Sequence, residues 1–211
     1  MDLGDVRREY ESLRIGKQDL DDDPILQFGQ WLRQARDHEL LDATAMTLAT
    51  ASPDGRPSAR IVLLKHFDRD GFCWYTDSRS RKGQELRDNP RAALLFHWRD
   101  FSRQIRVHGQ VSQLPPGDAE NYFQSRPEGS RFSAAASHQS AEIPSRVALE
   151  DEVERLRAAH PDGRVPRPEA WLGYRLAPEY FEFWQGQDSR LHDRIVYTPA
   201  ADGWIKRRLA P

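Results

Sequence analysis

Short runs of apolar and β-branched residues, separated by tight turn sequences, most restrict what this 211-residue chain can fold into. The runs at 45–52, 58–67 and 72–76 are separated by the turn sequences PDGR and DRDG. Turns of this kind connect antiparallel neighbours. We therefore predict that these three runs form an antiparallel meander.

Five more strand-like runs follow this block, and few helical segments lie between them. The runs are at 92–98, 103–114, 171–184, 190–198 and 203–211. Many sequential strands with a few helices around them favour an antiparallel β-barrel over a doubly wound sheet. The predicted fold class is mainly β with peripheral helices (α+β).

Capping residues and helical periodicity mark the predicted helices. Asp23 and Pro24 begin a helix at 24–38, because an N-cap and a first-turn proline precede apolar residues at helical spacing. Further helical segments are expected within 78–90, 116–126 and 146–160. A Ser/Ala/Gly-rich loop is expected at 129–140.

The start of the chain differs from the rest. Residues 1–22 are polar and acidic and show no sustained periodicity. We predict a mobile N-terminal arm at 1–22, followed by a single domain at 23–211, since the length suffices for one good core.

Composition and missing motifs argue against several classes of protein. The 31 Lys and Arg nearly balance the 33 Asp and Glu, so no global basic field would hold nucleic acid. Cys73 is the single cysteine, which excludes an internal disulfide and fits a reducing compartment. No apolar run has the length of a membrane span, and no signal peptide begins the sequence. Without HExxH, CxxC or a His pair at ligand spacing, a metal site is not expected. We expect a cytoplasmic protein.

A first candidate anion site lies where a strand-like run passes into a helix, in the sequence TDSRSRKGQEL. A helix N-terminus offers free N–H groups and partial positive charge, and Arg81 and Lys82 add full charges beside Ser78 and Ser80. A phosphate cradle and a well-capped surface helix explain this segment equally well.

Two further sets of residues carry groups that suit phosphate. Arg60 and Lys65 bracket four apolar residues, and their odd spacing places them on opposite faces of a regular strand. Either they contact two different ligand groups, or they are the polar ends of a buried strand. Tyr122 and Arg126 share a helical face, and Ser130 follows in the predicted loop. Together the three sets suggest a ligand system with more than one phosphate.

The segment EFWQGQDSRLHDRI places three basic residues at alternate positions. In an extended strand Arg190, His192 and Arg194 would share one face, where like charges disfavour one another unless a ligand lies among them. A solvated edge strand is the simpler explanation from this segment alone.

The chain resembles the pyridoxine/pyridoxamine 5′-phosphate oxidase family, FMN enzymes with a split-barrel fold. The motifs that carry the resemblance run in family order: RREY at 7–10, RIVLLK at 60–65, YT at 75–76, SRK at 80–82, RQ at 103–104, YFQSRPEGS at 122–130, QS at 139–140 and EFWQGQDSRLHDR at 182–194. The fold implied is an antiparallel FMN-binding split β-barrel. One departure is SRFSAAASHQS, which lacks a tryptophan usual before the QS pair.

The resemblance implies a homodimer with FMN at the subunit interface, touched by both chains. It assigns cofactor contacts to Arg60, Ile61, Val62, Leu63, Lys65, Tyr75, Thr76, Arg81, Lys82, Gln104, Gln139, Ser140, Trp184 and Arg194. It assigns substrate contacts to Arg7, Tyr10, Lys65, Tyr122, Arg126, Ser130, Arg190 and His192. Arg190 and His192 are the implied catalytic pair, acting through positioning and charge stabilisation.

The implied reaction oxidises pyridoxine 5′-phosphate or pyridoxamine 5′-phosphate to pyridoxal 5′-phosphate. A hydride equivalent passes to the flavin, and dioxygen reoxidises it to give hydrogen peroxide. Two other functions stay open at this point. One is a split-barrel flavin oxidase acting on another aromatic compound, of the phenazine-pathway type, and the other is a flavin-binding protein without turnover.

Overall fold

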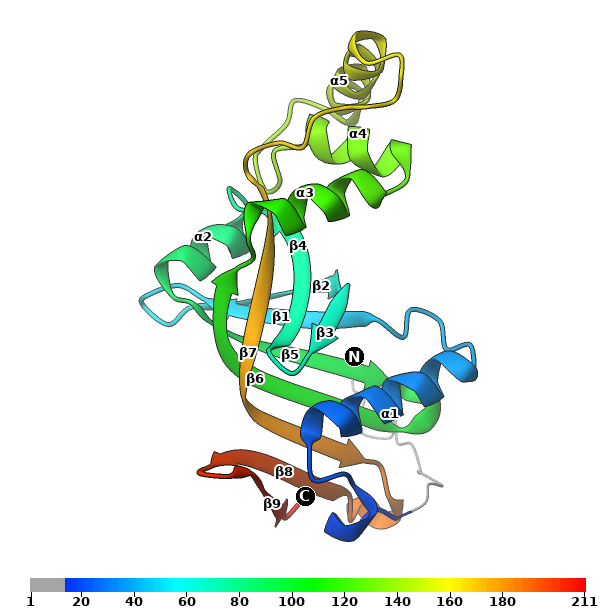
Figure 1. The fold of residues 1–211 in the computed structure, drawn as a ribbon, viewed down its shortest axis with the longest axis vertical. Coiled ribbons are helices and arrows are strands. Elements are labelled where there is room, and N and C mark those ends of the chain that lie inside the picture. Colours follow the sequence, from blue (N-terminus) through cyan, green and yellow to red (C-terminus); the bar gives the residue numbers. More distant parts are fainter. Residues whose placement is uncertain (1–13) are drawn as a thin grey trace, which may run out of the picture.

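The computed structural model describes residues 14–211, in which antiparallel strands are surrounded by helices (Figure 1). The strands are β1 (Ala45–Ala51), β2 (Pro57–Leu63), β3 (His66–Asp68), β4 (Gly71–Asp77), β5 (Arg91–Trp98), β6 (Arg103–Gln113), β7 (Trp171–Gln185), β8 (Asp193–Ala200) and β9 (Gly203–Leu209). The helices are α1 (Pro24–Asp37), α2 (Arg81–Asp88), α3 (Pro116–Ser125), α4 (Glu128–Ala136) and α5 (Arg146–Ala159), with short 3-10 turns η1 (Lys17–Asp19), η2 (Arg99–Phe101) and η3 (Asp188–Arg190). The predicted mainly β fold with peripheral helices is confirmed.

The sheet curls so that its two edge strands, β2 and β3, which follow each other in the chain, face one another. The strand order is β2-β1-β5-β6-β7-β4-β3, and β8 adds to the far part of β7 and carries β9. Residues 64 and 65 join the edges: Leu64 N donates to Thr44 O and Lys65 N donates to Cys73 O, both at 2.9 Å. The dipeptide therefore links the two sides of a barrel that is not closed by a continuous ladder.

The predicted three-stranded meander is wrong. β1 pairs with β2, but β4 pairs with β3 and β7 and not with β2. The run at 58–67 divides into two strands because the chain turns at Leu64, whose side chain is buried in the core. Turn sequences mark where a strand ends, but they do not say which strand it pairs with.

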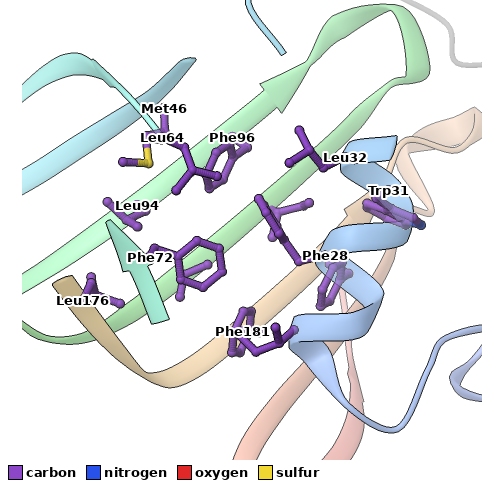
Figure 2. Packing of buried hydrophobic residues seen from close by; sticks show 14 of the residues in the cluster. Phe28, Trp31, Leu32, Met46, Leu64, Phe72, Leu94, Phe96, Leu176 and Phe181 are labelled. Carbon is purple, nitrogen blue, oxygen red and sulfur yellow. The ribbon is translucent and has the colours of Figure 1, made fainter. Parts of the chain in front are cut away.

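Helix α1 covers the open side of the sheet and completes the core. Its N-cap Asp23 accepts a hydrogen bond from Ile25 N at 2.8 Å, and Pro24 occupies the first turn as predicted. Figure 2 shows Phe28 of α1 facing Phe72 and Phe96 of the sheet, with ring centroids 4.8 and 4.9 Å apart. Burying one such ring contributes about 1.5–3 kcal/mol, so α1 holds the curled sheet in shape.

Helices α3, α4 and α5 gather at one end of the sheet, far from β8 and β9 (Figure 1). The loop predicted at 129–140 is wrong over most of its length, because 128–136 is α4. Alanines favour a helix there, Glu128 stands in the first turn, and Phe132 is buried in a second small core with Phe123 and Trp171.

The described end of the predicted arm is anchored to β8 and β9. Ile15 N donates to Asp193 Oδ2 at 2.9 Å, and Tyr197 donates its hydroxyl to Asp21 O at 2.7 Å. The side chains of Ile15 and Leu20 are buried. Residues 14–22 therefore pack on the C-terminal strands, and the arm stays a prediction for the residues before them. Among the helices of 14–211, none has the length and apolar character that crossing a membrane requires.

Candidate active site

A cavity of about 650 Å³ opens between β2, β4, α2 and the helices α3 and α4. Most residues that the sequence assigned to cofactor and substrate line it: Arg60, Ile61, Val62, Leu63, Lys65, Tyr75, Thr76, Lys82, Tyr122, Arg126, Ser130 and Gln139. Pro127, Gly129, Ser133, Ala134, Ser137 and Trp171 complete the lining. Segments more than 100 positions apart in the sequence thus meet in one space.

The predicted substrate-phosphate set lies together on the wall of this cavity. Lys65 follows β2, Tyr122 lies on α3, Arg126 caps that helix and Ser130 lies on α4. The Nη1 atom of Arg126 is buried and has no hydrogen-bond partner within 14–211. A buried guanidinium N–H without an acceptor is costly, so this donor is suited to an anion that enters the cavity.

Aromatic side chains hold this set in place, and one of them was not predicted. Tyr75 stacks on Tyr122 with ring centroids 4.1 Å apart and on Trp171 with centroids 5.4 Å apart. The Arg126 guanidinium lies 5.0 Å from the centre of the Trp171 ring. Sequence analysis placed Trp171 only at the start of a strand, since an aromatic residue there is an ordinary core residue.

A second cationic group lies at the α2 side of the cavity. Lys82 Nζ donates to Gln139 Oε1 at 2.8 Å and to Ser80 Oγ at 3.2 Å, and Thr76 Oγ1 donates to the same Gln139 oxygen at 2.9 Å. Burial of the Lys82 amine, with repulsion from Arg60, lowers its pKa from 10.5 to about 8. Without a bound anion this site therefore disfavours its own positive charge.

Arg60 is fixed in orientation by neighbours on β1, β2 and α2. Its Nη1 donates to Leu48 O at 3.1 Å and to Thr50 Oγ1 at 2.6 Å. Its Nη2 donates to Ser58 Oγ at 2.6 Å and to Glu85 Oε2 at 3.4 Å. Sequence analysis did not single out Glu85, although it stands four residues after Arg81 on α2.

Arg81 and Ser140 lie beside the cavity without lining it. Arg81 N donates to Ser140 Oγ at 3.2 Å, and Arg81 Nε donates to Glu85 Oε1 at 2.9 Å. Ser140 has a left-handed backbone with φ 68°. The predicted residues Arg7 and Tyr10 lie outside the described residues.

The remaining predicted residues form a separate group on the outer face of β6, β7 and β8. Gln104 is directly opposite Trp184 in the ladder, and Trp184 is directly opposite Arg194, so the three side chains share a face. The His192 ring lies 4.7 Å from the Trp184 ring. Within one chain, this outer-face group does not line the cavity.

The expected basic strand face at 190–194 is wrong. Residues 188–190 form the turn η3, Ser189 and Arg190 have left-handed φ values of 52° and 60°, and β8 begins only at Asp193. Gln187 N donates to His192 Nδ1 at 3.1 Å, which holds the imidazole beside the turn. Arg190 is exposed there, and of the three basic residues only Arg194 lies in the strand, where it pairs with buried Glu182 at 2.8 Å.

The curled antiparallel sheet that is not closed by a continuous ladder defines the class of split-barrel folds. An FMN binding protein related to pyridoxamine 5′-phosphate oxidase, from Nostoc punctiforme, has the same fold, with a TM-score of 0.69 at 18% identity over 87% of this chain and 96% of that chain. PhzG from Burkholderia lata, in complex with tetrahydrophenazine-1-carboxylic acid, gives a TM-score of 0.87 at 34% identity, over 92% of this chain and 95% of that one.

Sequence comparison identifies the family within this class. The model described as pyridoxamine 5′-phosphate oxidase matches residues 32–160, and the C-terminal dimerisation region of pyridoxine 5′-phosphate oxidase matches 171–211. Pyridoxine/pyridoxamine 5′-phosphate oxidases of Janthinobacterium and Herminiimonas arsenicoxydans are 47% and 49% identical over the whole of both chains. The chain belongs to the pyridoxamine 5′-phosphate oxidase family.

Proposed function

We propose that this chain catalyses the FMN-dependent oxidation of pyridoxine 5′-phosphate and pyridoxamine 5′-phosphate to pyridoxal 5′-phosphate, with reduction of dioxygen to hydrogen peroxide. The observation that carries the proposal is one cavity that is lined by two sets of cationic residues. One group contains Lys65, Tyr122, Arg126 and Ser130, and the other contains Arg60 and Lys82. Two groups of this kind suit a phosphorylated cofactor and a phosphorylated substrate bound together.

The residues of the cavity fit FMN. The buried amine of Lys82, near the N-terminus of α2, would bind the cofactor phosphate with Arg60 and Arg81. Residues 61–63 and Thr76 would lie along the flavin, and Gln139 and Ser140 would contact it from the segment after α4. Bound FMN would supply the hydride acceptor and the site of reoxidation by dioxygen.

This chain's residues would bind and orient the substrate. Lys65, Tyr122, Arg126 and Ser130 would hold its phosphate, which fixes the position of the reacting carbon. Arg190 and His192 would lie against the pyridine ring and stabilise charge, with Arg7 and Tyr10 closing over it. Burial, with repulsion from Arg190, lowers the pKa of His192, which favours its neutral form.

The site is proposed to be shared between two chains of a homodimer. The match to a dimerisation region over 171–211 supports a homodimer. The outer-face group does not line the cavity of its own chain. It consists of Gln104, Trp184, His192 and Arg194. Ile61, which lines the cavity, has an apolar side chain that is 65% exposed and that a partner would cover. We infer that the outer-face group of each subunit completes the cavity of the other.

The test of the function uses the purified protein. Its visible spectrum is recorded after incubation with FMN, and pyridoxine 5′-phosphate is then added in air. Yellow protein that forms hydrogen peroxide and the aldehyde in equal amounts is the expected result. A colourless protein that takes up no FMN would remove the cofactor from the proposal, and a yellow protein that forms neither product would be a binding protein.

A cytoplasmic location stays a prediction from the sequence.

The structural similarity to PhzG favours a second candidate, oxidation of an aromatic compound without a phosphate. Lys65 discriminates between the two together with Tyr122, Arg126 and Ser130, because a phosphate accepts hydrogen bonds from this many donors, whereas a carboxylate accepts fewer. We expect Lys65→Ala to raise the KM for pyridoxine 5′-phosphate about tenfold, the value of one charge-assisted hydrogen bond. Steady-state kinetics measure it, and an unchanged KM would favour the second candidate.

The lowered pKa of Lys82 predicts that FMN binding depends on pH. In the empty site the Lys82 amine is charged below pH 8 and neutral above it. A bound phosphate favours the charged amine. Binding of FMN above pH 8 therefore takes up a proton. The dissociation constant of FMN is expected to rise roughly tenfold between pH 7.5 and pH 9.5. Fluorescence titration of the apoprotein measures this. Lys82→Arg, which stays charged, is the control, and equal pH dependence in both proteins contradicts the assignment.

A further inference from the structure

A buried carboxylate lies directly behind the cationic α2 side of the cavity. Glu85 is 7% exposed on α2 and does not line the cavity. We propose that Glu85 is a positioning residue, which fixes Arg60 and Arg81 in the orientation that binds the phosphate of FMN. This inference rests on the proposed function and adds a residue that makes no contact with the cofactor itself.

The two oxygens of Glu85 divide the two arginines between them. Oε1 accepts from Arg81 Nε at 2.9 Å, one helical turn earlier. Oε2 accepts from Arg60 Nη2 at 3.4 Å, and also from the hydroxyls of Thr50 and Ser58, both at 2.5 Å. Thr50 and Ser58 in turn accept hydrogen bonds from Arg60 at 2.6 Å each. Glu85 is therefore the centre of a network that joins β1, β2 and α2.

This network restricts the guanidinium of Arg60. With Leu48 O as the fourth acceptor, all four terminal N–H groups of Arg60 have partners on β1, β2 and α2, which leaves its Nε–H and its positive charge for the phosphate. An arginine side chain loses rotamer entropy when it is fixed, and fixing it before the ligand arrives removes that cost from binding. The restriction would raise the affinity for a phosphate without any contact from Glu85.

The positive charges around Glu85 are a second reason for a carboxylate at this position. Arg60, Arg81 and Lys82 bring positive charge to one small region, and Arg60 already disfavours the charged form of Lys82. Burial of the Glu85 carboxyl acts to raise its pKa, but hydrogen bonds from Ser58, Thr50 and Arg81 and attraction to Arg60 lower it to about 2. Glu85 is thus ionised near neutral pH, and its negative charge keeps the two arginines together.

If Glu85 acted only through its charge, its removal would change the affinity for FMN in the opposite direction from a loss of positioning. A carboxylate close to a bound phosphate repels it, so its removal alone would tighten FMN binding. Loss of orientation in Arg60 and Arg81 would weaken FMN binding instead. The sign of the change in affinity therefore decides between the two roles.

The experiment compares FMN with riboflavin, which has the same ring system but no phosphate. Dissociation constants of both are measured by flavin fluorescence on wild-type apoprotein, Glu85→Ala and Glu85→Gln. We expect Glu85→Ala to weaken FMN binding about tenfold and to leave riboflavin binding unchanged within about twofold. Glu85→Gln keeps the shape of the side chain and one acceptor oxygen, so its loss is expected to be smaller, and it serves if the alanine variant does not fold.

Three further proteins complete the design: Arg60→Ala, Arg60→Ala with Glu85→Ala, and Glu179→Gln. In an Arg60→Ala protein, the additional loss from Glu85→Ala is expected to shrink to about threefold or less, because the residue to be positioned is gone. Glu179→Gln, which removes the carboxylate of a surface pair with Arg91 at 3.0 Å, is the matched control and should change neither constant.

The outcomes separate this inference from the function on which it rests. Equal weakening of FMN and riboflavin would assign Glu85 a general structural role and overturn the inference. Unchanged or tighter FMN binding in both Glu85 variants would overturn it as well. Failure of the wild-type protein to bind FMN would instead contradict the proposed function.

Discussion

Replacement of Arg126 by alanine is expected to raise the KM for pyridoxine 5′-phosphate by roughly a hundredfold. The buried Nη1 atom lacks a partner within 14–211, so in this structure the donor is already desolvated and the substrate phosphate alone would supply its acceptor. A hydrogen bond to a charged group contributes about 1.5–3 kcal/mol, and the guanidinium can donate two of them to one phosphate. Steady-state kinetics under air, with saturating FMN, measure the effect.

Two controls make the Arg126 result specific. Arg91→Ala removes an arginine that pairs with Glu179 on the surface, and it is expected to leave KM unchanged. Unphosphorylated pyridoxine tests the ligand group, because its weak oxidation should be equally slow in the wild-type protein and in Arg126→Ala. If Arg126→Ala impaired both compounds to the same degree, the arginine would not recognise the phosphate.

Local sequence signals were sufficient for most of the elements. Asp23 and Pro24 fix the start of α1, and Ser80 caps α2 by accepting a hydrogen bond from Gly83 N. These signals act within one turn of the chain, so spacing and residue type reveal them. The pairing of β4 with β7 was not predictable in the same way, since it depends on the turn at Leu64 and on closure of the sheet around α1.

Two local predictions failed for reasons that lie in tertiary structure. The Gly and Ser residues around the alanines of 129–140 suggested a loop, but the alanines favour a helix, and the burial of Phe132 against Phe123 and Trp171 stabilises it. The strand-like run at 190–198 predicted a strand that includes 190–194, but the left-handed residues Ser189 and Arg190 turn the chain first, and β8 begins at Asp193. A left-handed conformation in residues other than glycine has little signal in a single sequence.

Some residues of the candidate site could be predicted from the sequence, and others could be found only from their contacts. Cationic and hydroxyl residues of the cavity could be selected because their chemistry indicates phosphate. Trp171 and Glu85 could not, since a buried tryptophan and a helical glutamate are common without any ligand. Only their contacts reveal them, Trp171 with Tyr75 and Tyr122, and Glu85 with Arg60 and Arg81.

Two impaired chains are expected to restore activity when they form a dimer together, measured at a substrate concentration near the wild-type KM. One chain carries Arg126→Ala in the cavity, and the other carries Arg190→Ala with His192→Ala at the turn before β8. If the turn of one subunit completes the cavity of the other, a heterodimer has one site with both defects and one site with none. We expect the heterodimer, isolated through two different affinity tags, to have about half the wild-type activity per dimer.

The reciprocal arrangement gives the opposite prediction from the same substitutions. When all three substitutions are on one chain and its partner is wild type, each shared site receives one defect, and almost no activity is expected. Sites built within single chains would give the reverse, with about half the activity in this second heterodimer and almost none in the first. Neither Arg190 nor His192 lines the cavity within the described chain, so an arrangement shared between subunits would bring them to a substrate held by Arg126.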